Sequence, residues 1–164
     1  MIDRAYAITM AAYNQWMNAK LYEAAARLSD EQRKQDRGAF FKSLHGTLDH
    51  IVSGDMIWMY RFTGRSIEHF QLGQRFDDFG EMRAQRDSLD AEISAWAASL
   101  DGEWLKGDFA YFSKSYNAHY SKPAWLLVVH FFNHQTHHRG QASDLLMQMG
   151  IDPGATDLPA MPHR

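Results

Sequence analysis

Apolar side chains recur every three or four positions along four long segments of the chain, which is the pattern of amphipathic helices. In the first segment Ile8, Ala12 and Trp16 follow this spacing. The four segments span residues 3–28, 41–62, 78–100 and 121–149. Four helices of this length are typical of a bundle. We therefore predict an all-α fold, an antiparallel four-helix bundle.

Two shorter features accompany the predicted helices. Ser29 followed by Gln32 has the spacing of a capping box, so a short helix is expected to begin there. The segment 103–120 carries aromatic residues among Ser, Asn and Lys, including Phe109, Tyr111, Tyr116 and Tyr120. It is either a short hairpin or an ordered loop packed on the bundle, and the pattern leaves both open. The Pro-rich tail after Gly150 is expected to wrap the surface.

Length and composition narrow the possible functions. The chain has 164 residues, which predicts one domain over residues 1–164. Its net charge of −3 argues against a nucleic-acid partner or an anionic membrane surface. Cysteine is absent, which excludes a disulfide framework, an iron–sulfur cluster and a thiol nucleophile. No apolar run is long enough for a membrane span, and no signal peptide is recognisable, so we expect a cytoplasmic protein.

Histidine is the residue type that could carry chemistry, because four of the nine lie close together in the last segment. On a helical wheel, His138 lies at the centre of the apolar stripe and His134 within about 40° of it. His130 and His137 lie about 80–100° away, at the margin of the stripe or in solvent. A buried imidazole needs a partner, and two rings four residues apart can hold one metal ion. The alternative is a pair of hydrogen-bonded or exposed histidines.

A third ligand would have to come from another helix, and His45 and His50 are the candidates in the second segment. They point about 140° apart, so both cannot serve one site, and the wheel does not choose between them. Gly54, one turn beyond His50, would leave room beside that ring. The spacing of His134 and His138 resembles a zinc-protease helix, but Gln135 stands where that motif has its glutamate. Dinucleotide and phosphate-loop motifs are absent.

At these residues the sequence resembles the DinB-like (YfiT-like) family of metal-dependent proteins. The resemblance covers nearly the whole chain. It is carried by YNQWMN from Tyr13, SLHGTLDHIVSGDMIWMYR from Ser43, FFNHQTHHRGQ from Phe131 and the ending GIDPGATDLPAMP.

The resemblance implies a four-helix bundle, commonly a homodimer, with one divalent metal ion per chain, zinc or nickel. The implied ligands are His50, His134 and His138, with His137 as a neighbour that does not bind. Three imidazoles leave a coordination position open. By similarity we expect a metal-dependent transferase or hydrolase. The favoured activity is thiol S-transfer with a low-molecular-weight thiol cosubstrate, since the chain has no cysteine. The alternative is a non-catalytic metal-binding or dimerisation module.

Other residues in these motifs have two interpretations each. Asp55 could orient a ligand ring or act as a base, but we favour a salt bridge to Arg61 or Arg139. Arg139 could hold an anionic group or bond a carboxylate of the protein. Gln141 could bond a ligand ring.

Packing residues in the same motifs are also ambiguous. Trp16, Trp58 and Phe131 could line a pocket beside the metal, and core packing is the favoured interpretation. Asn14 and Asn18 could support the site or fix the packing of the first helix.

Overall fold

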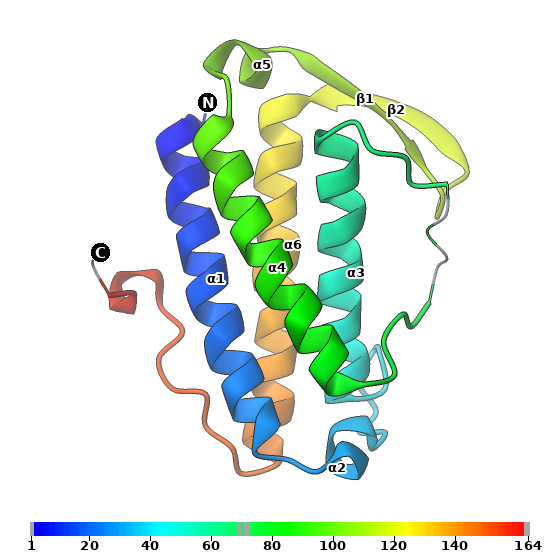
Figure 1. Ribbon diagram of the computed structural model, residues 1–164, viewed down its shortest axis with the longest axis vertical. Coiled ribbons are helices and arrows are strands. Elements are labelled where there is room, and N and C mark those ends of the chain that lie inside the picture. Colours follow the sequence, from blue (N-terminus) through cyan, green and yellow to red (C-terminus); the bar gives the residue numbers. More distant parts are fainter. Residues whose placement is uncertain (1, 69, 71–72, 163–164) are drawn as a thin grey trace.

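Four long helices form the body of the computed structural model, which describes residues 2–68, 70 and 73–162 (Figure 1). They are α1 (Arg4–Ala26), α3 (Leu44–Phe62), α4 (Phe79–Ser99) and α6 (Ala124–Gln148). Helices α1 and α3 each pack against both α4 and α6. The apolar sides of all four meet in one core that includes Leu48, Leu89 and Phe131. No helix in the described part of the chain is both long and apolar enough to cross a bilayer.

The helices do not all alternate in direction. Helices α1 and α6 run one way and α3 and α4 the other, so α3 is antiparallel to α6 but parallel to α4 (Figure 1). The prediction of an antiparallel bundle is therefore correct for α1–α4 and α3–α6 and wrong for α1–α6 and α3–α4. The reason is the connection between Phe62 and Phe79, which has to return from one end of the bundle to the other.

Side-chain oxygen atoms define where most helices begin. Asp3, Ser43 and Asp78 each accept a backbone N–H from the first turn of α1, α3 and α4. The short α2 (Asp30–Lys34) has the predicted capping box between Ser29 and Gln32, which confirms that prediction.

The insertion before the last helix corrects the all-α prediction. After α5 (Gly102–Lys106), strands β1 (Asp108–Ser113) and β2 (Ala118–Pro123) pair as an antiparallel hairpin. The protein is thus a helical bundle with a small sheet, and the hairpin alternative holds for this segment. Residues 121–123, expected to open the last helix, instead complete β2, because they pair with residues 108–110 of β1. The helix begins at Ala124, whose N–H donates to the carbonyl of Gly107.

The tail wraps the surface, as expected, and its residues 155 and 156 lie against α1. Tyr13 donates its hydroxyl hydrogen to the carbonyl of Thr156, and Lys20 donates to the carbonyl of Ala155. A short 3₁₀ helix, η1 (Leu158–Ala160), follows.

Candidate metal centre

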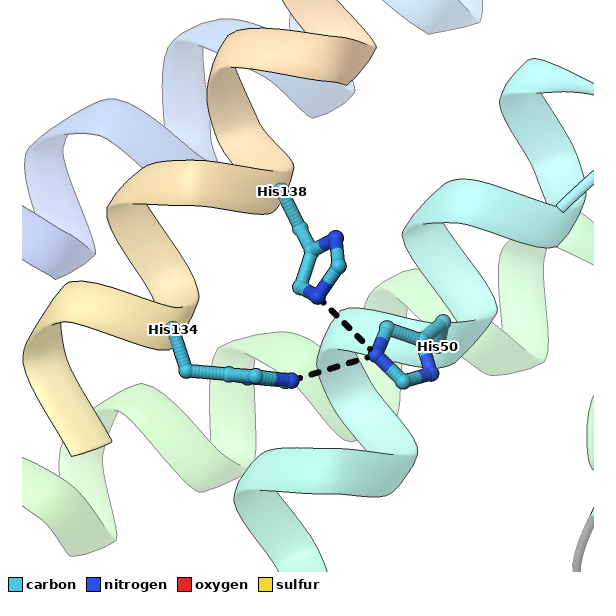
Figure 2. A group of neighbouring side chains, drawn as sticks. All are labelled: His50, His134 and His138. Atoms are coloured by element: carbon cyan, nitrogen blue, oxygen red, sulfur yellow. Dashed lines mark hydrogen bonds between the residues drawn. The ribbon is translucent and has the colours of Figure 1, made fainter. Parts of the chain in front are cut away.

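Three histidines from two antiparallel helices converge on one point. Helix α3 supplies His50, and α6 supplies His134 and His138 from successive turns (Figure 2). The Nε2 atom of His50 lies 3.2 Å from Nε2 of His134 and 3.2 Å from Nε2 of His138. One nitrogen atom from each of the three rings lies within 4.8 Å of the others. We call this group the His triad.

Hydrogen bonding alone cannot satisfy the His triad. A neutral imidazole Nε2 carries either one hydrogen or one lone pair. His50 can therefore form a proper hydrogen bond with only one of the two nitrogens that face it. A shared cation is the partner that accepts three lone pairs at once.

The spacing of the His triad fits a divalent metal ion. Zinc–imidazole bonds of about 2.0–2.1 Å in a tetrahedral arrangement place two ligand nitrogens about 3.3 Å apart. Both distances from His50 are 3.2 Å. Among the described residues, no further His, Asp or Glu belongs to the group. The protein thus has a three-His group that could bind a metal ion and would leave a position open for another molecule.

Gln141 sets the tautomer of His138. Its side-chain oxygen lies 2.7 Å from Nδ1 of His138. An amide oxygen only accepts, so Nδ1 must carry the hydrogen and Nε2 keeps its lone pair toward His50. Such an outer hydrogen bond is the usual support of a metal-binding histidine. Gln141 therefore bonds a ring of the His triad, which is the contact that the sequence analysis considered for it.

Burial keeps the three rings uncharged. It lowers the pKa of His50 to about 4 and that of His134 to about 3, and it lowers the pKa of His138 as well. The neighbouring histidines add to this effect, since a second positive charge in the group would be repelled. At neutral pH all three are in the form that binds metals.

Phe41 is a residue that the sequence analysis missed. Its ring stacks on His50, with centroids 3.9 Å apart and an interplanar angle of 18°. The segment before α3 can approach this closely because a Cβ at Gly46 would overlap the carbonyl oxygen of Phe41. Gly46, in the first turn of α3, was the signal that the sequence offered. Phe41 therefore fixes the plane of His50 and covers one of its faces.

Gly54 makes room for a ligand of the triad itself. The sequence suggested that this glycine leaves space beside His50. A Cβ at Gly54 would lie 3.0 Å from Cε1 of His134, so the space holds the His134 ring. The absence of a side chain on α3 thus allows the two helices to bring their imidazoles together.

Replacing Gly54 with alanine is expected to weaken metal binding without weakening the metal-free fold. The new methyl group pushes the His134 ring away from His50, and we expect an affinity loss of about tenfold or more, as for other disturbed supports of a metal site. Alanine also favours the helix by about 1 kcal/mol. A competition titration with a chromogenic zinc chelator measures the affinity. Gly140→Ala is the matched control on α6, because its Cβ would meet nothing. Equal affinities in the two variants would contradict this account.

Two adjoining cavities reach the His triad. The hairpin cavity, of about 470 Å³, lies between α3, α6 and the β-hairpin and is lined by His134, among others. The loop cavity, of about 360 Å³, is lined by His50 and by Phe41 and Gln74 from the loops beside α3. Gly54 lines both cavities. The two cavities thus reach two of the three histidines, His134 from one side and His50 from the other.

The remaining histidine candidates lie outside the triad. His45 is buried, and its Nε2 lies 2.8 Å from the carbonyl oxygen of Phe76, so it anchors the connection before α4. Asp49 does the same, accepting the backbone N–H groups of Arg75 and Phe76. His130 and His137 lie on the exposed side of α6, where the wheel placed them.

Asp55 belongs to a buried polar network and not to the His triad. The salt-bridge interpretation is right, but the partner is Arg86 of α4, whose Nη1 lies 2.6 Å from the Asp55 carboxylate, and not Arg61 or Arg139. Arg86 also pairs with Asp90 at 2.8 Å. Desolvation raises the pKa of Asp55 to about 6, against the opposing effect of Arg86.

The same network reaches the other two helices. Asn14 and Asn18 of α1 donate to the carboxylate of Asp90. Arg139 of α6 donates to the side-chain oxygens of Asn14 and Thr136. The two asparagines therefore fix helix packing, and Arg139 bonds a carboxamide where we had considered a carboxylate. We call the six residues Asn14, Asn18, Asp55, Arg86, Asp90 and Arg139 the buried network.

Two of the aromatic residues considered for a pocket or for the core, Phe131 and Trp58, differ in their surroundings. Phe131 is fully buried in the core. Trp58 is also buried, yet it lines the hairpin cavity and lies beside His130.

The fold and the His triad together define a class of protein: a helical bundle with an inward-facing group of three histidines that could bind a metal ion. The model of the DinB family matches residues 1–164, so the chain belongs to the DinB family. It is also similar to Protein DinB of Bacillus subtilis (strain 168). The two are 23% identical over 157 residues, which cover 93% of this chain and 91% of that protein. The resemblance noted in the sequence is thereby confirmed.

Proposed function

We propose that the protein is a metal-dependent enzyme that transfers a small thiol, through its sulfur atom, to an electrophilic substrate. One divalent ion per chain, zinc or nickel, is held by His50, His134 and His138. When bound, such an ion supplies Lewis acidity, which lowers the pKa of a coordinated water or thiol. Imidazole nitrogens suit both metals.

The observation that carries this proposal is the combination of an open coordination position with two adjoining cavities. A hydrolase needs room for one organic substrate and water, whereas a transferase needs room for two molecules. The hairpin cavity reaches His134 and the loop cavity reaches His50, so two small molecules can approach the His triad separately. Their sizes lie within the range of ordinary small-molecule sites.

The roles of the surrounding residues follow from their contacts. Gln141 keeps His138 in the metal-binding tautomer. Phe41 covers one face of His50. In the reaction, the thiol sulfur forms a bond to an electrophilic carbon. The leaving group departs with its bonding electron pair, and the S–H proton is released with it as an acid.

The test is a thiol-transfer assay on metal-loaded protein. Glutathione, cysteine and coenzyme A are each offered with chlorodinitrobenzene, and thioether formation is followed by absorbance. We expect at least one thiol to react faster than its spontaneous rate. This enzyme-dependent part of the rate should be lost in His138→Ala and retained in His137→Ala. Metal-loaded protein that accelerates none of these reactions would favour the alternative, a non-catalytic metal-binding or dimerisation module.

Two further parts of the proposal concern the setting of the reaction. A cytoplasmic location would supply small thiols in their reduced form. The homodimer implied by the resemblance would be tested by sedimentation of the purified protein. A monomer would remove the homodimer from the proposal without affecting the metal site.

A further inference from the structure

We propose that the hairpin cavity binds a small organic anion with a flat, unsaturated body, and that Arg61 is its anchor. This inference rests on the proposed function only in taking that anion to be one of the two substrates. It assigns the chemical class of the molecule that lies beside His134.

The charged side chains that line the hairpin cavity are all basic. They are Arg61 from α3, and Lys114 and Lys122 from the hairpin segment, and none of the lining residues is Asp or Glu. Within the part of the chain that the structure describes, none of these three cations forms an ion pair. This positive charge is local, because the whole chain carries a net charge of −3. A cavity lined by one sign of charge concentrates ligands of the other sign.

Arg61 is held in place without a counter-charge. Its guanidinium carbon lies 4.7 Å from the ring centroid of Trp58 and 4.9 Å from that of Tyr111. Its Nη2 donates to the carbonyl of Phe112 at 3.0 Å. Two aromatic rings and one carbonyl thus orient a half-buried cation. A partly desolvated cation of this kind is more stable when an anion binds beside it.

Lys114 is positioned in a similar way. Its Nζ donates to the carbonyl oxygens of Glu68 and Phe70 at 2.6 and 2.9 Å. These neutral acceptors direct the ammonium group and leave its charge uncompensated. Lys122 is exposed on β2 and lines the same cavity. The binding region is therefore built from an oriented arginine, an oriented lysine and a more solvated lysine.

The walls of the hairpin cavity favour a flat ligand. Trp58, Tyr111 and Tyr120 line it, and the two tyrosine rings stack across the hairpin with centroids 5.7 Å apart. Aromatic side chains attract planar, polarisable groups on their faces and edges. With about 470 Å³ available, the cavity has room for a small ring or conjugated chain. An anion anchored at Arg61 would extend toward His134, which lines the same space.

The test uses benzoate as the probe and benzamide as its uncharged analogue, followed by heteronuclear NMR titration of the metal-free protein. Without metal, benzoate cannot bind through the ion, so a shift must come from the protein. We expect benzoate to perturb the indole signal of Trp58 and benzamide to bind about tenfold or more weakly, as for loss of a charge-assisted hydrogen bond. We expect Arg61→Gln to weaken benzoate binding by a similar factor.

The controls separate a specific anchor from general charge. Arg65→Gln is the matched control, because Arg65 pairs with Glu92 and does not line the cavity. It should leave the benzoate affinity unchanged. Lys122→Gln is a milder second variant at an exposed position, and it should weaken benzoate by a smaller factor. The same spectra report whether each variant is folded.

The outcomes distinguish this inference from the proposed function. Equal binding of benzoate and benzamide, or equal binding by wild type and a folded Arg61→Gln, would overturn the anion site. If Arg61→Gln does not fold, an unchanged benzoate affinity in Lys122→Gln would overturn it. Arg61-dependent benzoate binding in a protein that transfers no thiol would support the anion site and contradict only the proposed function.

Discussion

Replacing His134 with alanine is expected to abolish stoichiometric metal binding and leave the bundle folded. The wild-type protein, purified without a tag and incubated with zinc or nickel, should contain about one ion per chain by elemental mass spectrometry. His134→Ala removes one of the three ligands. It should lower the metal affinity by more than about 100-fold, which is the largest loss usual when only a hydrogen-bond partner of a ligand is removed. His50→Ala and His138→Ala should behave in the same way.

Stability gives a second measure of the same prediction. A ligand present at about a thousand times its dissociation constant adds about 4 kcal/mol to the free energy of unfolding. For a chain of this size that raises the melting temperature by about 10 °C. The metal should therefore stabilise the wild type by this amount, whereas His134→Ala, with a site at least 100-fold weaker, should gain no more than about 1.4 kcal/mol at the same metal concentration. In the metal-free state the two proteins should melt within a few degrees of each other, because the hydrophobic core does not depend on the ion.

His137→Ala is the matched control for this experiment. It removes an imidazole from the same helix, next to His138 in the sequence but on the exposed side of α6. Its metal content should equal that of the wild type. A wild type that takes up neither metal, or a His134→Ala variant that retains a full equivalent, would contradict the assignment of the His triad.

Two of the three histidines could be predicted from the residues alone, because helical periodicity is a local property of the sequence. The wheel for the last segment placed His134 and His138 on the inner face, and both lie there in the structure. It could not choose between His45 and His50, because that choice depends on which face of α3 meets α6. The family resemblance selected His50, and the structure brings His50 to the other two.

Contacts between distant segments could not be predicted in this way. The ring of Phe41 reaches His50 through a turn whose shape depends on Gly46. The ion pair of Asp55 was assigned to arginines nearby in sequence or motif, whereas its partner Arg86 lies on α4. Helix directions were missed for the same reason, since the amphipathic pattern does not show which way a long connection returns. The sequence also left the hairpin as one of two alternatives, because a hairpin depends on the pairing of β1 with β2, which a local pattern does not show.

The buried network explains how four helices of similar pattern keep one arrangement. Arg86 of α4 pairs with Asp55 of α3, and Asp90 of α4 receives hydrogen bonds from Asn14 and Asn18 of α1. A rotation or slide of any of these helices would leave a charge unpaired in the core. Asp55 lies one position after Gly54, where an added Cβ would meet the His134 ring, so the network also holds the helix that carries His50.

Replacing Arg86 with methionine is expected to destabilise the protein by about 3–5 kcal/mol, the usual cost of removing one partner from a buried ion pair. Arg86 and Asp55 have side-chain exposures of 1% and 0%, so water cannot replace the lost contact. Urea unfolding followed by circular dichroism measures the loss. Arg83→Met, on the same helix with no ion pair in the described structure, should cost less than about 0.5 kcal/mol.

The deficit of Arg86→Met is its loss of unfolding free energy relative to the wild type. This deficit should depend on pH if it comes from lost charge pairing, and it should not if it comes from lost packing. Burial already raises the pKa of Asp55 to about 6, and Arg86 opposes that rise, so its removal should raise the pKa further. The folded variant then binds a proton at a pH where the unfolded chain does not, and its stability relative to wild type increases as the pH falls. We expect the deficit to shrink as the pH falls from about 8 to about 6 and to stay level below that, where Asp55 of the wild type is protonated as well. A deficit that stays constant over this range would mean that methionine merely packs poorly, and it would contradict an electrostatic role for Arg86.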